Sequence, residues 1–130
     1  MKTILAVLLA VYLLAGCASQ APQAVDNGKP GQIEVFIYQD GNANGRFDVG
    51  EAGRMDDIAK PEMTSCSASS QHEPVRAQTD EKGVALFSDL KAGRYCVSYL
   101  GKETTTTKLQ VDVLVNSELT ARVEFGIMVR

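Results

Sequence analysis

Short segments in which apolar and polar residues alternate decide the class of fold that this chain can adopt. In the first, Ile33, Val35 and Ile37 fall on one face of an extended chain, and the residues between them fall on the other. A period of two residues is typical of a β-strand with a buried face. Five further segments have strand character: residues 75–79, 84–87, 95–100, 108–115 and 119–127.

Turn-forming sequences join several of these segments, at residues 80–83, 91–93 and 116–117. No segment after residue 31 shows a convincing helical period, so the pattern predicts an all-β, antiparallel sandwich. Residues 58–72 alternate least, and we expect a degenerate edge strand there, followed by a loop. The threonine run at 104–107 is expected to be an edge or a loop.

The N-terminus carries the marks of an export signal. Lys2 is followed by an apolar run over residues 4–15, which is interrupted only by Tyr12. About a dozen apolar residues are too few to span a bilayer, which needs about 20, but they suit a signal peptide. One interpretation of this region is an ordinary signal peptide that happens to be followed by a cysteine.

The next residues, Leu14-Ala15-Gly16-Cys17, resemble the bacterial lipobox. The resemblance implies a signal peptide over residues 1–16, cleavage before Cys17, and lipidation of that cysteine. Residues 17–31 are polar and rich in Gly and Pro, and we expect a flexible tether, followed by one domain over 32–130. The absence of Asp after Cys17 points to the outer membrane of the bacterial cell envelope in bacteria that sort lipoproteins by this rule.

Charge and cysteine content narrow the functional classes. The chain has a formal net charge of −3, and loss of Lys2 makes the mature form one unit more negative. With no basic cluster, nucleic acid is not an expected partner. Besides Cys17 the chain has Cys66 and Cys96, and an oxidising compartment favours a disulfide between them.

A twelve-residue segment after the first strand has the spacing of a calcium-binding loop. With Asp40 counted as position one, Gly45 stands at position six and Phe47 at position eight. Arg46 at position seven would contribute its main-chain carbonyl. Because Ca²⁺ takes 6–8 oxygen ligands, alternate side chains of a tight loop can converge on it. The side-chain oxygens fall at positions one, three, five, nine and twelve: Asp40, Asn42, Asn44, Asp48 and Glu51.

The alternative is an Asn- and Gly-rich hairpin loop that binds no metal, because both residue types favour turns. Only three of the side-chain ligands are charged, and Arg46 offsets part of that charge. We therefore expect weak affinity for Ca²⁺, on the order of 10⁻⁴–10⁻³ M, as in extracellular modules. Mg²⁺ fits less well, because it favours fewer protein ligands and retained water.

Three stretches together resemble the B-type repeats of Gram-positive surface adhesins, the SdrD B-like and collagen-adhesin B-like (prealbumin-like) family. They are the strand at 33–38, the loop with its following Ala-Gly at 40–53, and the Thr-Asp-x-x-Gly to Gly-x-Tyr stretch at 79–95. The resemblance covers about residues 32–100. It implies a small Greek-key, Ig-like sandwich in which calcium has a structural role.

The chain departs from that family at two positions. Collagen-adhesin B-like domains often carry a Lys–Asn isopeptide bond that a buried acid assists. Tyr38 stands at the position of the lysine and Tyr99 at that of the acid, so we expect no isopeptide bond. A Cys66–Cys96 disulfide could be the covalent brace instead.

Catalysis is not expected, because acid–base groups do not cluster outside the loop. His72 is the only histidine and lies in a polar stretch. A soft-metal site of Met63, Cys66, His72 and Cys96 is an alternative only if the thiols stay reduced. We expect a membrane-anchored, calcium-binding structural or adhesive module. The alternative is an envelope accessory subunit that binds a protein or carbohydrate through strand edges or loops.

Overall fold

The computed structural model describes residues 20–62, 66 and 75–129. The signal peptide at 1–16, the lipobox with Cys17, and the residues Met63 and His72 lie outside the described part of the chain. None of the described residues forms a helix long and apolar enough to cross a bilayer.

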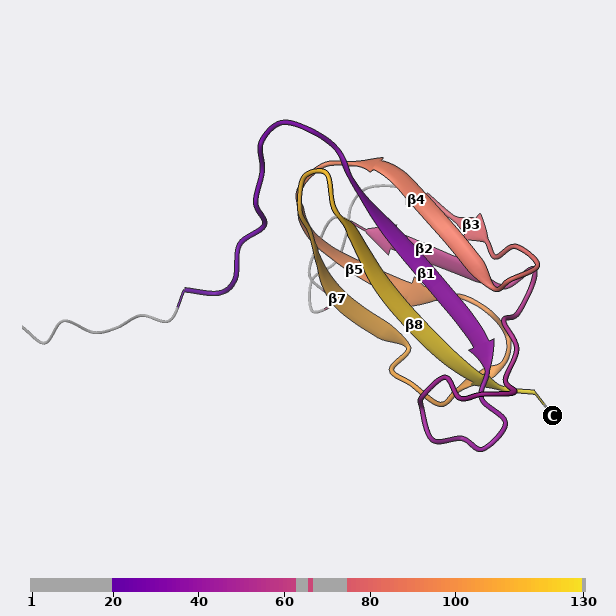
Figure 1. The fold of residues 1–130 in the computed structure, drawn as a ribbon. Coiled ribbons are helices and arrows are strands. Elements are labelled where there is room, and N and C mark those ends of the chain that lie inside the picture. The colour runs from indigo at the N-terminus through magenta and orange to yellow at the C-terminus, as the bar shows by residue number, and fades with distance from the viewer. Residues whose placement is uncertain (1–19, 63–65, 67–74, 130) are drawn as a thin grey trace, which may run out of the picture.

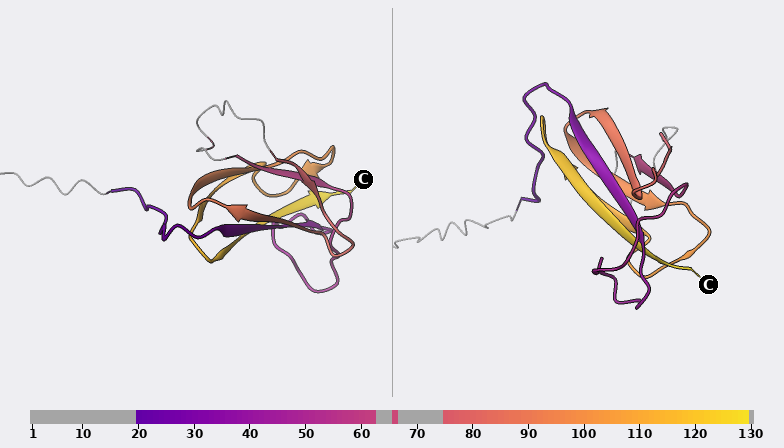
Figure 2. Two further views of the ribbon diagram at one scale, coloured as in Figure 1. Left: turned by 90° about the horizontal axis from the view of Figure 1, so that it is seen from above. Right: turned by 45° about the vertical axis from the view of Figure 1, so that its right-hand side comes forward.

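In the described part of the chain, eight strands form two four-stranded sheets that face each other (Figures 1 and 2). The first sheet has the order β4-β1-β8-β6 and the second has the order β3-β2-β5-β7. The all-β sandwich expected from the alternating pattern is therefore confirmed. The strands are β1 Gly31–Gln39, β2 Ile58–Glu62, β3 Ala77–Gln78, β4 Val84–Leu90, β5 Gly93–Tyr99, β6 Thr104–Thr105, β7 Gln110–Val115 and β8 Thr120–Met128.

One strand pair departs from the expected antiparallel arrangement. The first and last strands, β1 and β8, run parallel, in a register from Gln32 opposite Thr120 to Gln39 opposite Ile127. The other strand pairs are antiparallel. Alternation of apolar residues shows which face of a strand is buried, but it is the same for either direction of the neighbouring strand.

The weak strand expected within 58–72 exists, but its expected place at a sheet edge is wrong. β2 lies between β3 and β5. Pro61 lacks a backbone N–H and would be out of place where both sides of a strand are paired. β3 pairs only with Ile58 and Ala59, whereas β5 pairs with residues 59–62. Among the described residues, Pro61 therefore has a strand on one side only.

The core lies between the sheets and is built from the alternating apolar residues. Ile33, Val35 and Ile37 of β1 are fully buried, as the pattern predicts. On β5, Cys96 forms a disulfide with Cys66, with their Cα atoms 4.8 Å apart. The expected disulfide is therefore confirmed. The rest of the core cluster consists of Ala59, Ala85, Phe87, Tyr95, Val97, Tyr99, Val115, Val123, Phe125 and Ile127.

Residues 25–30, at the end of the expected tether, lie against the turn between β7 and β8. The backbone N–H of Ser117 donates to the carbonyl of Val25, and that of Glu118 donates to the carbonyl of Pro30, both at 2.9 Å. The ammonium of Lys29 lies 2.7 Å from the Glu118 carboxylate. This part of the segment is held against the domain rather than free of it.

Candidate metal centre

The candidate calcium loop leaves the end of β1 and returns beside it, at the opposite end of the sandwich from the chain that leads into β1 (Figure 1). The N–H of Gln39 donates to the carbonyl of Ala52 at 2.9 Å, and an isolated bridge joins Tyr38 to Gly53. The N–H of Asp40 donates to Ile127 on β8 at 2.9 Å. The two ends of the loop are thus held together at the edge of the β1–β8 pair.

Asp40, the first expected ligand, is the most enclosed residue of the loop, with an exposed fraction of 1%. One carboxylate oxygen accepts the N–H of Gly45 at 2.7 Å, and the other accepts that of Asn44 at 3.1 Å. Burial by itself would raise the pKa of this carboxyl. The neighbouring Thr106 hydroxyl and hydrogen bonds from the loop backbone outweigh burial and lower the pKa. Asp40 is held as an anion inside the loop.

Asn42, Asn44 and Asp48 meet at one oxygen atom. The side-chain amides of both asparagines donate to Oδ2 of Asp48, at 2.8 and 2.7 Å. These two bonds lower the pKa of Asp48. The Oδ1 atoms of Asn42 and Asn44 accept the N–H groups two residues onward, at 3.1 and 2.8 Å. Three of the expected ligands therefore already contact one another.

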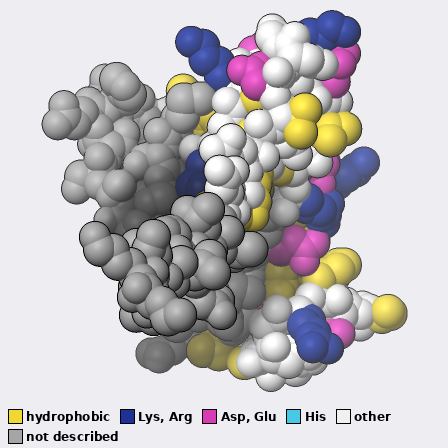
Figure 3. Space-filling view, turned by 90° about the vertical axis from the view of Figure 1, so that its left-hand side faces the viewer, with side chains coloured by type: hydrophobic (Ala, Val, Ile, Leu, Met, Phe, Trp, Pro, Cys, Tyr) yellow, Lys and Arg dark blue, Asp and Glu magenta, His cyan; other side chains and the backbone are white. Residues whose placement is uncertain are grey.

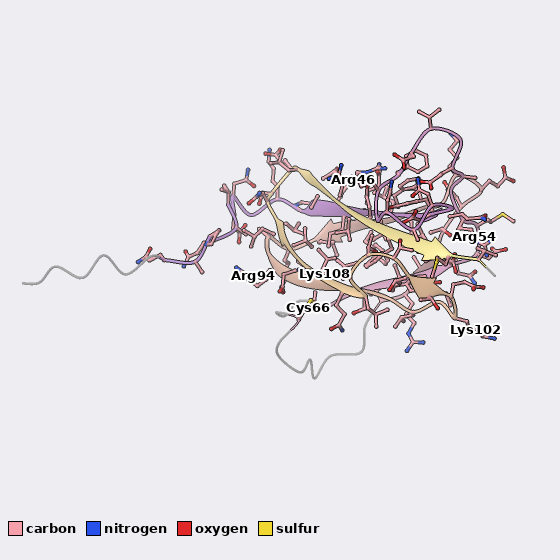
Figure 4. The ribbon with its side chains drawn as sticks, turned by 90° about the horizontal axis from the view of Figure 1, so that it is seen from below. Arg46, Arg54, Cys66, Arg94, Lys102 and Lys108 are labelled. Carbon is pink, nitrogen blue, oxygen red and sulfur yellow. A yellow bond between two sulfur atoms is a disulfide. The ribbon has the colours of Figure 1, made fainter. Side chains whose placement is uncertain are left out.

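Glu51, the last expected ligand, closes the loop with both carboxylate oxygens. One oxygen accepts the N–H of Gly41, and the other accepts the N–H of Asp48, each at 2.9 Å. The positive φ of 73° at Gly45 provides the sharp turn expected at position six. The sixth expected donor is the carbonyl of Arg46, whose side chain is labelled in Figure 4.

The donor set fits a hard divalent cation in chemistry, because every expected ligand atom is an oxygen from one closed loop. In the described part of the chain, no three His, Cys, Asp or Glu side chains are grouped as a metal site. The asparagine amides direct nitrogen, not oxygen, toward Asp48. Rotation of these two amides would present their oxygens instead. With their oxygens turned inward, these residues would hold Ca²⁺, and the bound ion would link the segments of the loop.

Phe47, which the pattern marked only as an apolar position, joins the loop to the outer face of the β1–β8 sheet. Its ring centroid lies 4.9 Å from that of Phe36 and 5.4 Å from that of Tyr38, both in edge-to-face geometry. The Arg122 guanidinium covers the same face, 4.9 Å from the Phe36 ring. These contacts bury Phe36 and Tyr38 on the side of β1 that points away from the core.

The two tyrosines at the family's isopeptide positions have separate packing roles. Tyr38 stacks on Phe36 outside the sheet, whereas Tyr99 lies in the core with its ring 6.1 Å from that of Phe125. Burial, reinforced by nearby carboxylates, raises the pKa of each phenol to about 12. The hydroxyl of Tyr99 donates to Asp57 at 3.3 Å.

Charges of both signs are interspersed over the described part of the face shown in Figure 3, with apolar side chains scattered among them. On the outer face of the first sheet, Arg122 pairs with Glu34 and Glu124. Beneath the second sheet, the N–H of Cys66 donates to Asp112 of β7 at 2.8 Å. In the loop of residues 40–51, carboxylates accept hydrogen bonds both from side-chain amides and from the loop backbone.

No protein-family model and no curated protein matches this chain. Solved structures do match. The Bacillus anthracis TIE protein is similar over 77% of this chain, with a TM-score of 0.55 and 14% identity. GBS52, the minor pilin of Streptococcus agalactiae, is similar over 77%, with a TM-score of 0.54 and 12% identity. A streptococcal ancillary pilin is similar over 78%, with a TM-score of 0.54 and 13% identity.

The match covers 16% of the TIE protein, 44% of GBS52 and 33% of the ancillary pilin. The chain therefore corresponds to one part of each of these longer proteins. At such low identity the likeness shows the fold alone. This chain has the β-sandwich fold of domains in Gram-positive pilins, in agreement with its resemblance to the prealbumin-like B-type repeats.

Proposed function

We propose that this chain is a non-enzymatic β-sandwich module of the bacterial cell envelope, anchored by lipid at Cys17 and stabilised by Ca²⁺ in the loop of residues 40–51. Its role is structural or adhesive. The observation that carries the proposal is the closed loop itself, in which all six expected ligand residues lie between two ends held by β1 and β8.

Bound Ca²⁺ would stabilise the fold because the loop contacts both central strands of the first sheet, β1 and β8. Asp40 follows β1 directly, and its N–H donates to Ile127 of β8. Ligand that binds only the folded state adds RT ln(1 + [L]/Kd) to stability. With Kd on the order of 10⁻⁴–10⁻³ M, about 2 mM Ca²⁺ adds roughly 0.6–1.8 kcal/mol.

The structural or adhesive role rests on two kinds of support. The fold is shared with domains of proteins named as minor and ancillary pilins. The lipobox resemblance at residues 14–17 supports attachment to a membrane, and the residue after Cys17 favours the outer membrane. A small sandwich on a lipid anchor could present a binding surface at the membrane or connect other components of the envelope.

Calcium titration of the protein tests the metal site. We expect the melting temperature to rise with millimolar CaCl₂ and to return on addition of EDTA. The double substitution Asp48→Asn and Glu51→Gln should abolish the rise. Glu81→Gln, an exposed carboxylate in the 80–83 turn, is the matched control and should leave the rise intact. Identical melts in CaCl₂ and EDTA would remove calcium from the proposal.

The anchor is tested separately by expressing the full chain in a bacterium and determining the mass of its N-terminal peptide. We expect a lipid-modified Cys17 as the first residue and recovery of the protein in the outer-membrane fraction. Cys17→Ser should abolish both the modification and the cleavage that depends on it. An unmodified Cys17 within a secreted, soluble protein would contradict this part.

A second candidate function is that of an accessory subunit that binds an envelope protein by adding a strand to one of its sheets. Within the described residues, β4 and β7 stand at sheet edges, and Leu86 on β4 is half exposed. Edge strands offer free backbone groups to an extended partner. A cross-linked complex in envelope extracts that Leu86→Lys abolishes would favour this role.

A further inference from the structure

The threonine run at 104–107 lies next to the candidate loop rather than on a free edge. β6 pairs with the end of β8, with Thr104 opposite Met128 and Thr105 opposite Ile127. Past β6, the N–H of Thr106 donates to the carbonyl of Gly126 at 2.8 Å. This keeps Thr106 beside Gly126 of β8. The next residue of that strand, Ile127, accepts the N–H of Asp40.

The close packing around Gly126 shows where the Thr106 side chain lies. A Cβ atom at Gly126 would stand 2.5 Å from Oγ1 of Thr106 and 2.9 Å from the hydroxyl of Tyr38. A Cβ atom at Gly45, in the middle of the loop, would stand 3.4 Å from the carbonyl oxygen of Thr106. Thr106 therefore fills the space between β8 and the inner side of the loop.

The hydroxyl of Thr106 is a buried polar group that has no hydrogen-bond partner of ordinary geometry among the described residues. A buried hydroxyl without a partner is unfavourable. Asp40 borders the same space, because its N–H donates to Ile127, the residue after Gly126, and its carboxylate accepts the N–H of Gly45, which lies against the carbonyl of Thr106. The neighbouring Thr107 differs, because its hydroxyl already accepts the N–H of Gly126 at 3.3 Å.

We propose that Thr106 is a positioning residue of the cation site, whose hydroxyl donates to the Asp40 carboxylate and fixes its orientation toward the centre of the loop. This inference rests on the proposed calcium site and deepens it. Asp40 is the innermost expected ligand, so its orientation decides whether an oxygen faces the cation. Residues that orient a metal ligand typically affect metal affinity by roughly 10–100-fold when they are replaced.

The test is isothermal titration calorimetry with CaCl₂ on the full chain, purified in detergent. Thr106→Val keeps the shape of the side chain and removes the hydroxyl, and we expect Ca²⁺ affinity to fall by roughly 10-fold. Thr106→Ser retains a hydroxyl and should bind within about 3-fold of the original. Thr104→Val, on the exposed side of the same run, is the matched control and should leave affinity unchanged.

The outcomes separate this inference from the function on which it rests. If the unaltered protein binds no Ca²⁺, both are overturned. If it binds and Thr106→Val binds equally well, the calcium site stands and the role of Thr106 is overturned. Equal weakening by Thr106→Val and Thr106→Ser would also overturn it, because packing rather than the hydroxyl would then be responsible. Should Thr106→Val not fold, Thr106→Ala is measured against Thr106→Ser in the same way.

Discussion

Phe47 packs the loop against the outer face of the first sheet. Its truncation should lower stability more than truncation of any other apolar residue in the loop. Its ring contacts Phe36 and Tyr38 edge-on. Phe47→Ala would remove both contacts and expose the outer face of β1. The prediction is a less stable fold even in EDTA, because the contacts involve no metal ligand.

The magnitude follows from how much of the ring is covered. Phe47 is 47% exposed, so truncation loses roughly half of the 1.5–3 kcal/mol that full burial of such a side chain is worth. Each edge-to-face pair adds about 0.5–1.5 kcal/mol, and we take the low end for a half-exposed ring. The sum is about 2 kcal/mol. In a domain of about 100 residues this lowers the melting temperature by roughly 8–16 °C.

Urea unfolding with EDTA present, followed by far-ultraviolet circular dichroism, measures this difference. Val49 in the same loop is fully exposed, so Val49→Ala is the matched control and should change stability by less than about 0.5 kcal/mol. An equally small change for Phe47→Ala would refute the argument that the loop is clamped through this ring. A large change for Val49→Ala would refute the placement of the loop.

Two further predictions concern covalent and acid–base chemistry. Reduction of the Cys66–Cys96 disulfide, which closes a loop of about 31 residues, should lower stability by about 3–4 kcal/mol in the chain-entropy model, measured as a shift of the unfolding midpoint with dithiothreitol. A midpoint that dithiothreitol leaves unchanged although both thiols are free would contradict it. Burial, with a smaller contribution from a neighbouring carboxylate, raises the pKa of Tyr99 from 10.0 to about 12. The folded state thus holds the phenol proton more tightly, and the stability that this gives below pH 10 is lost as the pH rises to 12. Absorbance at 295 nm should show a tyrosinate step near pH 12 to which both Tyr38 and Tyr99 contribute. Tyr99→Phe should reduce the amplitude of this step, and an unchanged titration curve would contradict the assignment.

The sequence pattern was sufficient for the fold class and for much of the core, because both follow from local alternation. Ile33, Val35 and Ile37 were expected on one buried face and lie in the core. The same pattern failed for β2, where Pro61 and weak alternation suggested an edge strand. Whether a strand has one neighbour or two depends on distant segments, and nothing in residues 58–62 encodes the length of β3.

The candidate site divides in the same way. The spacing of Asp40, Asp48 and Glu51 along the chain suggested a closed loop, and the structure shows that loop held together by its own hydrogen bonds. The contacts that seat the loop could not be expected from spacing. Phe47 meets two rings of β1, and Thr106 approaches from a segment far away in the chain.

Sequence alone therefore determined the local features of this protein: which residues form strands, which side of each strand is apolar, where the chain turns, and which oxygen-bearing residues share one loop. Tertiary structure decided the parallel pairing of β1 with β8, the inner place of β2, and the burial of Asp40. The physical reason is that periodicity and turn preference depend on neighbours in the chain. Strand order, register and the enclosure of a carboxylate depend instead on segments that meet only when the two sheets close over a common core.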